Sequence, residues 1–138
     1  MEAIFKDEVF YITGSSGGIG FATAKLCIEK GATVVITGRD ADNLTNAEAE
    51  LLKISPKVIA HNVDVSNELA ILESLNEVHK SCGRIDGLVN NAPSIHTGKI
   101  TDLSLSAWKT NFKANLDAVF LATKTVLPWM IEAKQGSI

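Results

Sequence analysis

A glycine-rich stretch near the start of the chain, Thr13–Gly20, constrains the fold more than any other feature. It has the pattern T-G-x-x-x-G-x-G, follows the apolar run 8–12, which is typical of a buried strand, and precedes 21–30, which is typical of a helix. Glycines allow a sharp turn and a close approach of the backbone, and the helix start leaves N–H groups unpaired. The stretch predicts a phosphate-binding turn. The alternative is a flexible turn rich in serine and glycine.

The rest of the chain alternates apolar runs with helical patterns. Further strands are expected at 32–37, 57–63 and 84–90, and the first residues of a fifth at 136–138. Helices are expected from a cap at Asp40 or Asp42 to Lys53, from a cap at Ser66 to a stop at Gly83, over 105–113 after a cap at Ser104, and over 115–133. This order predicts an α/β fold, a doubly wound parallel sheet with right-handed crossovers that is incomplete at its C-terminal end. Residues 1–138 are expected to form one domain, or the N-terminal part of a longer one.

Composition excludes several classes of protein. The chain of 138 residues has a net charge of −3, which argues against binding to nucleic acid. The sequence holds no run of about 18 apolar residues that would cross a membrane. Cys27 and Cys82 lack metal-ligand spacing and are interpreted as reduced thiols, which favours a cytoplasmic location. His61, His79 and His96 have no spacing typical of a metal site.

Four features together resemble the short-chain dehydrogenase/reductase family. The stretch Thr13–Gly20 is similar to its glycine motif, and Asp64 follows the third strand where the family usually has an Asp near the adenine. Asn90-Asn91-Ala92-Pro93 is similar to its N-N-A-G signature, with Pro93 in place of glycine. Asn115 falls where the family carries the asparagine of its catalytic tetrad. The resemblance implies a Rossmann fold, a nicotinamide dinucleotide, a small-molecule carbonyl or alcohol substrate, and a homo-oligomer, dimer or tetramer.

The resemblance also implies the residues of a dinucleotide site. Backbone N–H groups around Ser15 to Ile19 would bind the pyrophosphate, and the hydroxyls of Ser15 and Ser16 would add hydrogen bonds. Asp64 would accept a hydrogen bond from the adenine amine, or act as a carboxylate at a helix N-terminus beside Ser66. Asn90 would join neighbouring strands, contact the cofactor ribose, or both. The full set is Gly14, Ser15, Ser16, Gly18, Ile19, Gly20, Arg39, Asp64, Val65, Asn90, Asn91 and Ala92.

The residues after the second strand favour NADP(H) over NAD(H). NAD selectivity calls for an acidic residue at the strand end, where this chain has Gly38 followed by Arg39. Glycine removes the steric and electrostatic obstacle to a 2′-phosphate, and arginine binds phosphate with charge-assisted hydrogen bonds. A shift of one residue would instead place Asp40 at this point, and Arg39 would then be an ordinary surface charge.

The family's catalytic Tyr-x-x-x-Lys pair does not occur in these 138 residues. The single tyrosine, Tyr11, lies in the first strand and is predicted to be core, and Ser137 lies at the wrong end of the fifth strand for a substrate-binding serine. Asn115 is the one catalytic residue expected here. We therefore interpret the chain as the N-terminal part of a longer NADP(H)-dependent reductase, truncated after Ile138 and inactive alone. The alternative is a non-catalytic nucleotide-binding or interaction module. The long helix that carries Trp129 and Met130 is a candidate for a dimer surface, or else covers one face of the sheet.

Overall fold

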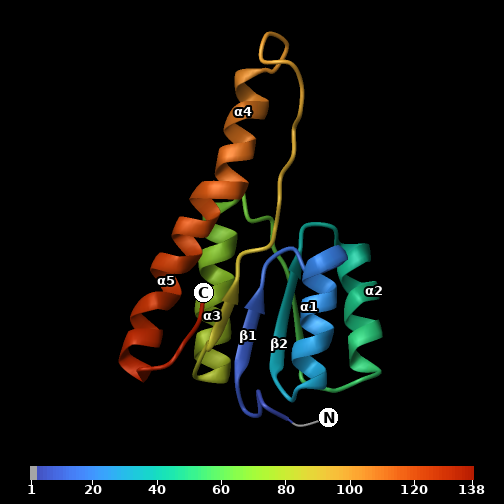
Figure 1. The fold of residues 1–138 in the computed structure, drawn as a ribbon, viewed down its shortest axis with the longest axis vertical. Coiled ribbons are helices and arrows are strands. Elements are labelled where there is room, and N and C mark those ends of the chain that lie inside the picture. Colours follow the sequence, from blue (N-terminus) through green and yellow to red (C-terminus); the bar gives the residue numbers. More distant parts are fainter. Residues whose placement is uncertain (1–2) are drawn as a thin grey trace.

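The computed structural model describes residues 3–138 and contains a parallel sheet with helices on both faces (Figure 1). The strands are β1 (Val9–Ile12), β2 (Thr33–Gly38), β3 (Val58–Asn62) and β4 (Gly87–Val89), in the spatial order β3-β2-β1-β4. All three pairings are parallel, and Tyr11 lies opposite Val35 on one side and Leu88 on the other. The predicted doubly wound sheet is confirmed.

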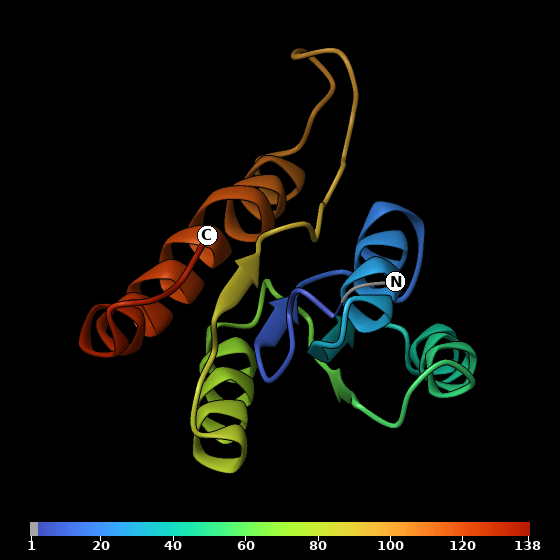
Figure 2. The same cartoon turned by 60° about the horizontal axis from the view of Figure 1, so that its bottom comes forward.

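The helices divide between the two faces of this sheet, as Figures 1 and 2 show. Helices α1 (Gly18–Glu29) and α2 (Ala41–Leu52) cover one face, and α3 (Glu68–Cys82) and α5 (Ala118–Ala133) cover the other. Each face therefore has its own core. Burying β-branched strand residues between helices on both sides is the arrangement that a parallel sheet requires.

The C-terminal helix is longer than predicted. Helix α4 (Leu105–Phe112) continues through a single π-helical turn, η1 (Lys113–Asp117), directly into α5. Asn115 therefore lies inside a continuous helix instead of at the start of one. In Figure 2 the segment between β4 and α4 runs far out from the sheet before the chain returns through this helix.

Most of the expected helix caps are confirmed. Asp40 Oδ1 accepts the Asn43 N–H at 2.8 Å, Ser104 Oγ accepts the Ala107 N–H at 3.1 Å, and Gly83 ends α3 with φ of 76°. The cap predicted at Ser66 is wrong. Asn67 caps α3 by accepting the Ala70 N–H, because the Ser66 hydroxyl donates to Asp64 Oδ1 instead.

Three aromatic and apolar side chains test the core predictions. Tyr11 is fully buried, as predicted, and its hydroxyl lies 2.6 Å from Ser74 Oγ. Met130 is buried and Trp129 stacks on His79 of α3, with ring centroids 4.0 Å apart. These two side chains of the long helix therefore pack toward the sheet and α3, and a dimer surface on the helix stays a prediction.

The last described residues lie beside β4. The Ser137 N–H donates to the Asp86 carbonyl at 2.9 Å, and the Leu88 N–H donates to the Ser137 carbonyl at 3.0 Å. This parallel bridge between Gly87 and Ser137 confirms that residues 136–138 begin to pair as a fifth strand.

Candidate functional site

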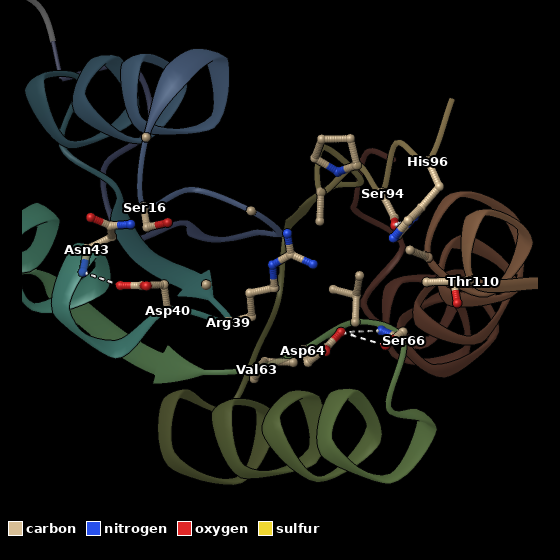
Figure 3. A pocket seen from close by; sticks show the side chains of 17 residues that line it. Ser16, Arg39, Asp40, Asn43, Val63, Asp64, Ser66, Ser94, His96 and Thr110 are labelled. Carbon is tan, nitrogen blue, oxygen red and sulfur yellow. Dashed lines mark hydrogen bonds between the residues drawn. The ribbon is translucent and has the colours of Figure 1, made fainter. Parts of the chain in front are cut away.

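A cavity of about 530 Å³ lies where the carboxyl ends of the four strands meet (Figure 3). Its wall is formed by the segments that follow each strand, at residues 14–17, 38–43, 63–66 and 92–96, and by two residues of the long helix, Thr110 and Ala114. Ligands of open α/β sheets bind at this edge, and the volume is within the usual range for a small-molecule site.

The turn after β1 depends on glycines at two places. Gly14 has φ of +62°, and a Cβ on it would lie 2.6 Å from the Ala92 Cα, so the turn packs directly on the segment after β4. Gly17 caps α1 without any side chain covering the helix end, and no acidic residue occupies the first helical turn. The positive end of the helix dipole therefore faces the cavity unneutralised, as the phosphate prediction requires.

Ser15 serves the fold instead of presenting a hydroxyl to the cavity. It is fully buried, and its Oγ donates to the Ile12 carbonyl at 2.7 Å and accepts the Thr37 N–H at 2.9 Å. Its own N–H donates to the Thr37 carbonyl at 2.8 Å. The expectation that the Ser15 hydroxyl binds the ligand is thus wrong, because this hydroxyl is hydrogen-bonded to the backbone at the ends of β1 and β2. Ser16, which lines the cavity, keeps that role as a prediction.

Asn91 holds the turn against β4. Its Nδ2 donates to the carbonyls of Thr13 (3.0 Å) and Gly14 (2.9 Å). The Thr13 hydroxyl in turn accepts the N–H groups of Asn91 and Ala92. The role of joining strands, expected of Asn90, belongs to Asn91. Asn90 lines a second, very small cavity between β4, α3 and α5.

Arg39 and Asp40 point in different directions. Figure 3 shows the Arg39 side chain extending into the cavity, whereas the Asp40 carboxylate turns away to cap α2. Arg39 takes part in neither of the ion pairs found among residues 3–138. Gly38 lies close to Ser16, and a Cβ on it would lie 2.8 Å from Ser16 Oγ. The cationic group at this end of the cavity is therefore the arginine, with no carboxylate in its place.

Asp64 lines the cavity just after β3 and accepts two hydrogen bonds from Ser66, from the hydroxyl at 2.7 Å and the N–H at 2.9 Å. The hydroxyl bond, with the backbone bond and the positive charge of Arg39, lowers the pKa of Asp64 despite partial burial. This matches the alternative of a carboxylate beside Ser66 at a helix start. The contact with adenine stays a prediction.

Asn115 contacts the backbone of Ser94 on the wall of the cavity. Its Oδ1 accepts the Ser94 N–H at 3.1 Å and its Nδ2 donates to the Ser94 carbonyl at 2.6 Å. Asn111, one turn earlier, makes the same pair of bonds to His96, at 2.8 and 2.9 Å. Asn111 was not among the residues predicted from the sequence, although two asparagines four residues apart on one helix are a detectable signal.

The structure brings only some of the predicted residues to the cavity. Those that line it are Gly14, Ser16, Arg39, Asp64, Val65 and Ala92. Ile19 is 79% exposed with its side chain outside the cavity wall, and Gly20 is buried, where a Cβ would lie 2.5 Å from Asn91 Nδ2. Ser94 and Thr110 line the cavity without having been predicted. Across residues 3–138, no group of three or more His, Cys, Asp or Glu side chains is placed to hold a metal ion.

Comparison with known proteins identifies the family. A family model described as short chain dehydrogenase matches residues 8–138. The chain belongs to the short-chain dehydrogenase family. This membership agrees with the glycine turn, the strand order and the position of Asn115 described above.

Among curated relatives, the chain is 31% identical over 135 residues to an uncharacterized oxidoreductase of Staphylococcus aureus (strain N315), covering 98% of this chain and 58% of the relative. It is 32% identical over 131 residues to an oxidoreductase of Botryotinia fuckeliana (strain B05.10), covering 95% of this chain and 47% of the relative. The chain thus spans about half of the length of the curated relatives that it matches.

Solved structures show the same architecture. A crystal structure of a metagenomic short-chain oxidoreductase in complex with NADP superposes with a TM-score of 0.91 at 34% sequence identity, covering 96% of this chain and 60% of that protein. A short-chain dehydrogenase from Streptomyces avermitilis superposes with a TM-score of 0.86 at 27% identity, covering 94% and 46%. No helix within residues 3–138 has the length and apolar character needed to span a membrane.

Proposed function

We propose that residues 1–138 form the dinucleotide-binding domain of an NADP(H)-dependent oxidoreductase that reduces a carbonyl or oxidises an alcohol of a small molecule. The observation that carries the choice of NADP(H) is Arg39, which extends into the cavity beside Gly38 while Asp40 is engaged as a helix cap. The complex with NADP in the metagenomic relative supports the same choice. NAD(H) is the weaker candidate, because no carboxylate occupies the end of β2.

The residues present fit such a cofactor. The amides from Ser16 to Ile19 at the start of α1, with the Ser16 hydroxyl, would bind the pyrophosphate. Arg39 would bind the 2′-phosphate, and Asp64 and Val65 would lie along the adenine. Bound here, the cofactor would supply or accept the hydride. Gly18 and Gly20 act indirectly, by allowing the turn and the close packing of α1 on Asn91, which places the amides.

Catalysis needs groups that residues 3–138 do not supply. The single tyrosine, Tyr11, is fully buried with its hydroxyl bonded to Ser74, so it cannot act as the general acid. Asn115 would contribute by fixing the wall of the cavity at Ser94. We expect no hydride transfer from residues 1–138 alone, with the serine, tyrosine and lysine of the family's mechanism beyond Ile138. In the alternative, a non-catalytic nucleotide-binding module, NADPH binds but the complete natural protein shows no turnover with any carbonyl.

Fluorescence titration with NADPH and NADH tests the proposal. Replacing Arg39 by alanine removes a charged hydrogen bond of about 1.5–3 kcal/mol, so the Kd for NADPH should rise roughly 10- to 150-fold. The Kd for NADH, which lacks the 2′-phosphate, should stay the same. Lys25→Ala is the matched control, because it removes one positive charge from an exposed position of α1 outside the cavity. Equal loss of both cofactors in Arg39→Ala would contradict the assignment to the 2′-phosphate.

We also propose that the long helix pairs with a second copy of the chain. Four large apolar side chains recur every fourth residue on its surface and are 43–60% exposed: Trp108, Phe112, Leu116 and Phe120. A continuous apolar stripe of this kind is typical of an interface. Sedimentation analysis should show a dimer or tetramer, and Phe120→Glu should shift it to monomer. A monomeric wild-type protein would exclude the interface.

A cytoplasmic location remains a prediction that agrees with the two free cysteines.

A further inference from the structure

Two asparagines on successive turns of the long helix bind alternate residues of the segment after β4. Asn115 makes both of its hydrogen bonds to the backbone of Ser94, and Asn111 makes both of its to the backbone of His96. The spacings are comparable, because Asn111 and Asn115 lie about one helical turn apart, a rise of roughly 5 Å, and two extended residues span about 6.6 Å. The two side-chain amides of the helix thus bond to the backbone of residues 94–96 as a neighbouring strand would.

This pairing decides which side chains face the cavity. Residues i and i+2 of an extended segment point to the same side, and Ser94 and His96 both line the cavity. Ile95, between them, points the other way and is 75% exposed. Figure 3 shows the Ser94 hydroxyl and the His96 ring directed toward each other at this wall.

The bonds to the backbone also orient the amide of Asn111. Its Nδ2 donates to the His96 carbonyl, so its Oδ1 is the atom that accepts the His96 N–H. The same Oδ1 lies 3.4 Å from Nδ1 of the His96 ring, and Ser94 Oγ lies 3.4 Å from it on the other side. These separations are longer than those of strong hydrogen bonds.

The contacts nevertheless distinguish the two neutral forms of the imidazole. With the proton on Nδ1, the ring can donate to Asn111 Oδ1, which only accepts. The Ser94 hydroxyl can accept from Nδ1–H or donate to its lone pair, so it favours neither form. With the proton on Nε2, the lone pair of Nδ1 would face the lone pairs of Asn111 Oδ1. Nε2 has no hydrogen bond to any of residues 3–138, so it is the ring atom left for a ligand.

We propose that Asn111 is a positioning residue, which holds His96 with the proton on Nδ1 so that Nε2 offers a hydrogen-bond acceptor at the wall of the cavity. The ligand group that this acceptor takes is a donor, such as the hydroxyl of an alcohol. The inference deepens the proposed function, since an alcohol or its carbonyl is the substrate class proposed above. It differs from the role of Asn115, which binds Ser94 and does not contact the ring.

Nitrogen-15 NMR of the full-length protein tests this inference. The His96 signals are identified by their loss in His96→Gln. In the wild type, Nδ1 should carry the proton, and Asn111→Ala should shift the ring toward the Nε2–H form. The His96 amide should exchange with solvent roughly tenfold faster in Asn111→Ala, because its acceptor is lost. Asn111→Asp keeps an acceptor oxygen in place and should restore both the Nδ1–H form and the slow amide exchange.

Asn76→Ala is the matched control, because Asn76 is an exposed helical asparagine that bonds only within α3, to the Leu72 carbonyl. It should leave the His96 signals unchanged. An Nε2–H form in the wild type, or unchanged His96 signals in Asn111→Ala, would overturn the inference. A purely structural role for Asn111 would change the amide exchange without changing the tautomer. NADPH titration of the same samples separates the two proposals, because a wild type that fails to bind NADPH refutes the cofactor assignment while the tautomer result stands.

Discussion

Replacing Gly20 by alanine sets two effects of opposite sign against each other. Gly20 lies in the first turn of α1, with helical backbone angles that any residue can adopt. Alanine is favoured over glycine within a helix by about 1 kcal/mol, so intrinsic propensity alone predicts a more stable protein.

Packing predicts the opposite, and by a larger amount. A Cβ on Gly20 would lie 2.5 Å from Asn91 Nδ2, 2.6 Å from the Gly14 carbonyl oxygen and 2.9 Å from the Ser15 Cα. It would enter the hydrogen bond from Asn91 Nδ2 to the Gly14 carbonyl and displace the neighbouring bond to Thr13. Two such bonds contribute about 1 kcal/mol each, and forcing a methyl group into a packed site costs about 1–3 kcal/mol.

The balance is a loss of about 2–4 kcal/mol in the free energy of unfolding, after the gain in propensity is subtracted. Urea unfolding followed by circular dichroism measures it. Affinity for NADPH should fall as well, because the displaced turn carries the proposed phosphate ligands.

Asn91→Ala and the double variant Gly20→Ala/Asn91→Ala test whether the clash with Asn91 causes the loss of stability. Asn91→Ala removes one of the three crowded atoms, so Gly20→Ala should cost less in that background than in the wild type. Gly98→Ala introduces the same methyl group outside the cavity, with only Leu103 Cδ1 within 4 Å, at 3.9 Å, and should leave stability and NADPH binding close to those of the wild type. A Gly20→Ala variant that is as stable as the wild type, or more so, would refute the argument from packing.

Three further changes give expected outcomes. Burial raises the pKa of Tyr11 to about 12. The contribution of Tyr11 to the free energy of unfolding should therefore be complete below the ordinary pKa of 10.0 and should decline as the pH rises from there to about 12. Urea unfolding at alkaline pH should show that Tyr11→Phe abolishes this decline. The hydrogen bond from the Ser66 hydroxyl is the main cause of the lowered pKa of Asp64, so the contribution of Asp64 to stability is present above pH 3.8 and lost as the pH falls below that value. An NMR titration of Ser66→Ala should show a higher pKa for Asp64. An unchanged pKa would refute this cause. Asp86 is buried and accepts hydrogen bonds from the Val9 N–H and from two nitrogens of Arg84. Asp86→Ala leaves the Val9 N–H without its acceptor, so urea unfolding should show a loss of about 1–3 kcal/mol in the unfolding free energy, and Asp86→Asn should lose less.

Elements with a strong local pattern could be predicted from the sequence. The apolar runs of β1 and β2, the cap at Asp40 and the stop at Gly83 depend on neighbours a few residues away, and the structure confirms them. The cap of α3 was ambiguous because Ser66 and Asn67 are both good capping residues. The choice depends on Asp64, which takes the Ser66 hydroxyl.

The parts that could not be predicted depend on contacts between distant residues. The burial of Ser15 follows from its bond to Thr37, 22 residues later, and the packing of Gly20 follows from Asn91. The π-helical turn and the contact of Asn111 with His96 require knowing where the segment after β4 lies relative to the long helix. Sequence patterns locate the cavity by its glycines and charges, but they do not identify the wall that Ser94 and Thr110 form.

The π-helical turn allows the two halves of the long helix to be adjusted separately. Such a turn already accommodates one residue more than the α-helical turn that it replaces, so one further residue inserted among 113–117 would rotate α4 by about 100° relative to α5. The buried side of α5, at Ala118, Ala122 and Val126, would keep its place on the sheet. Asn111 would swing away from His96. Insertions of single residues at this point are therefore a route by which related chains could change ligand preference while conserving the core.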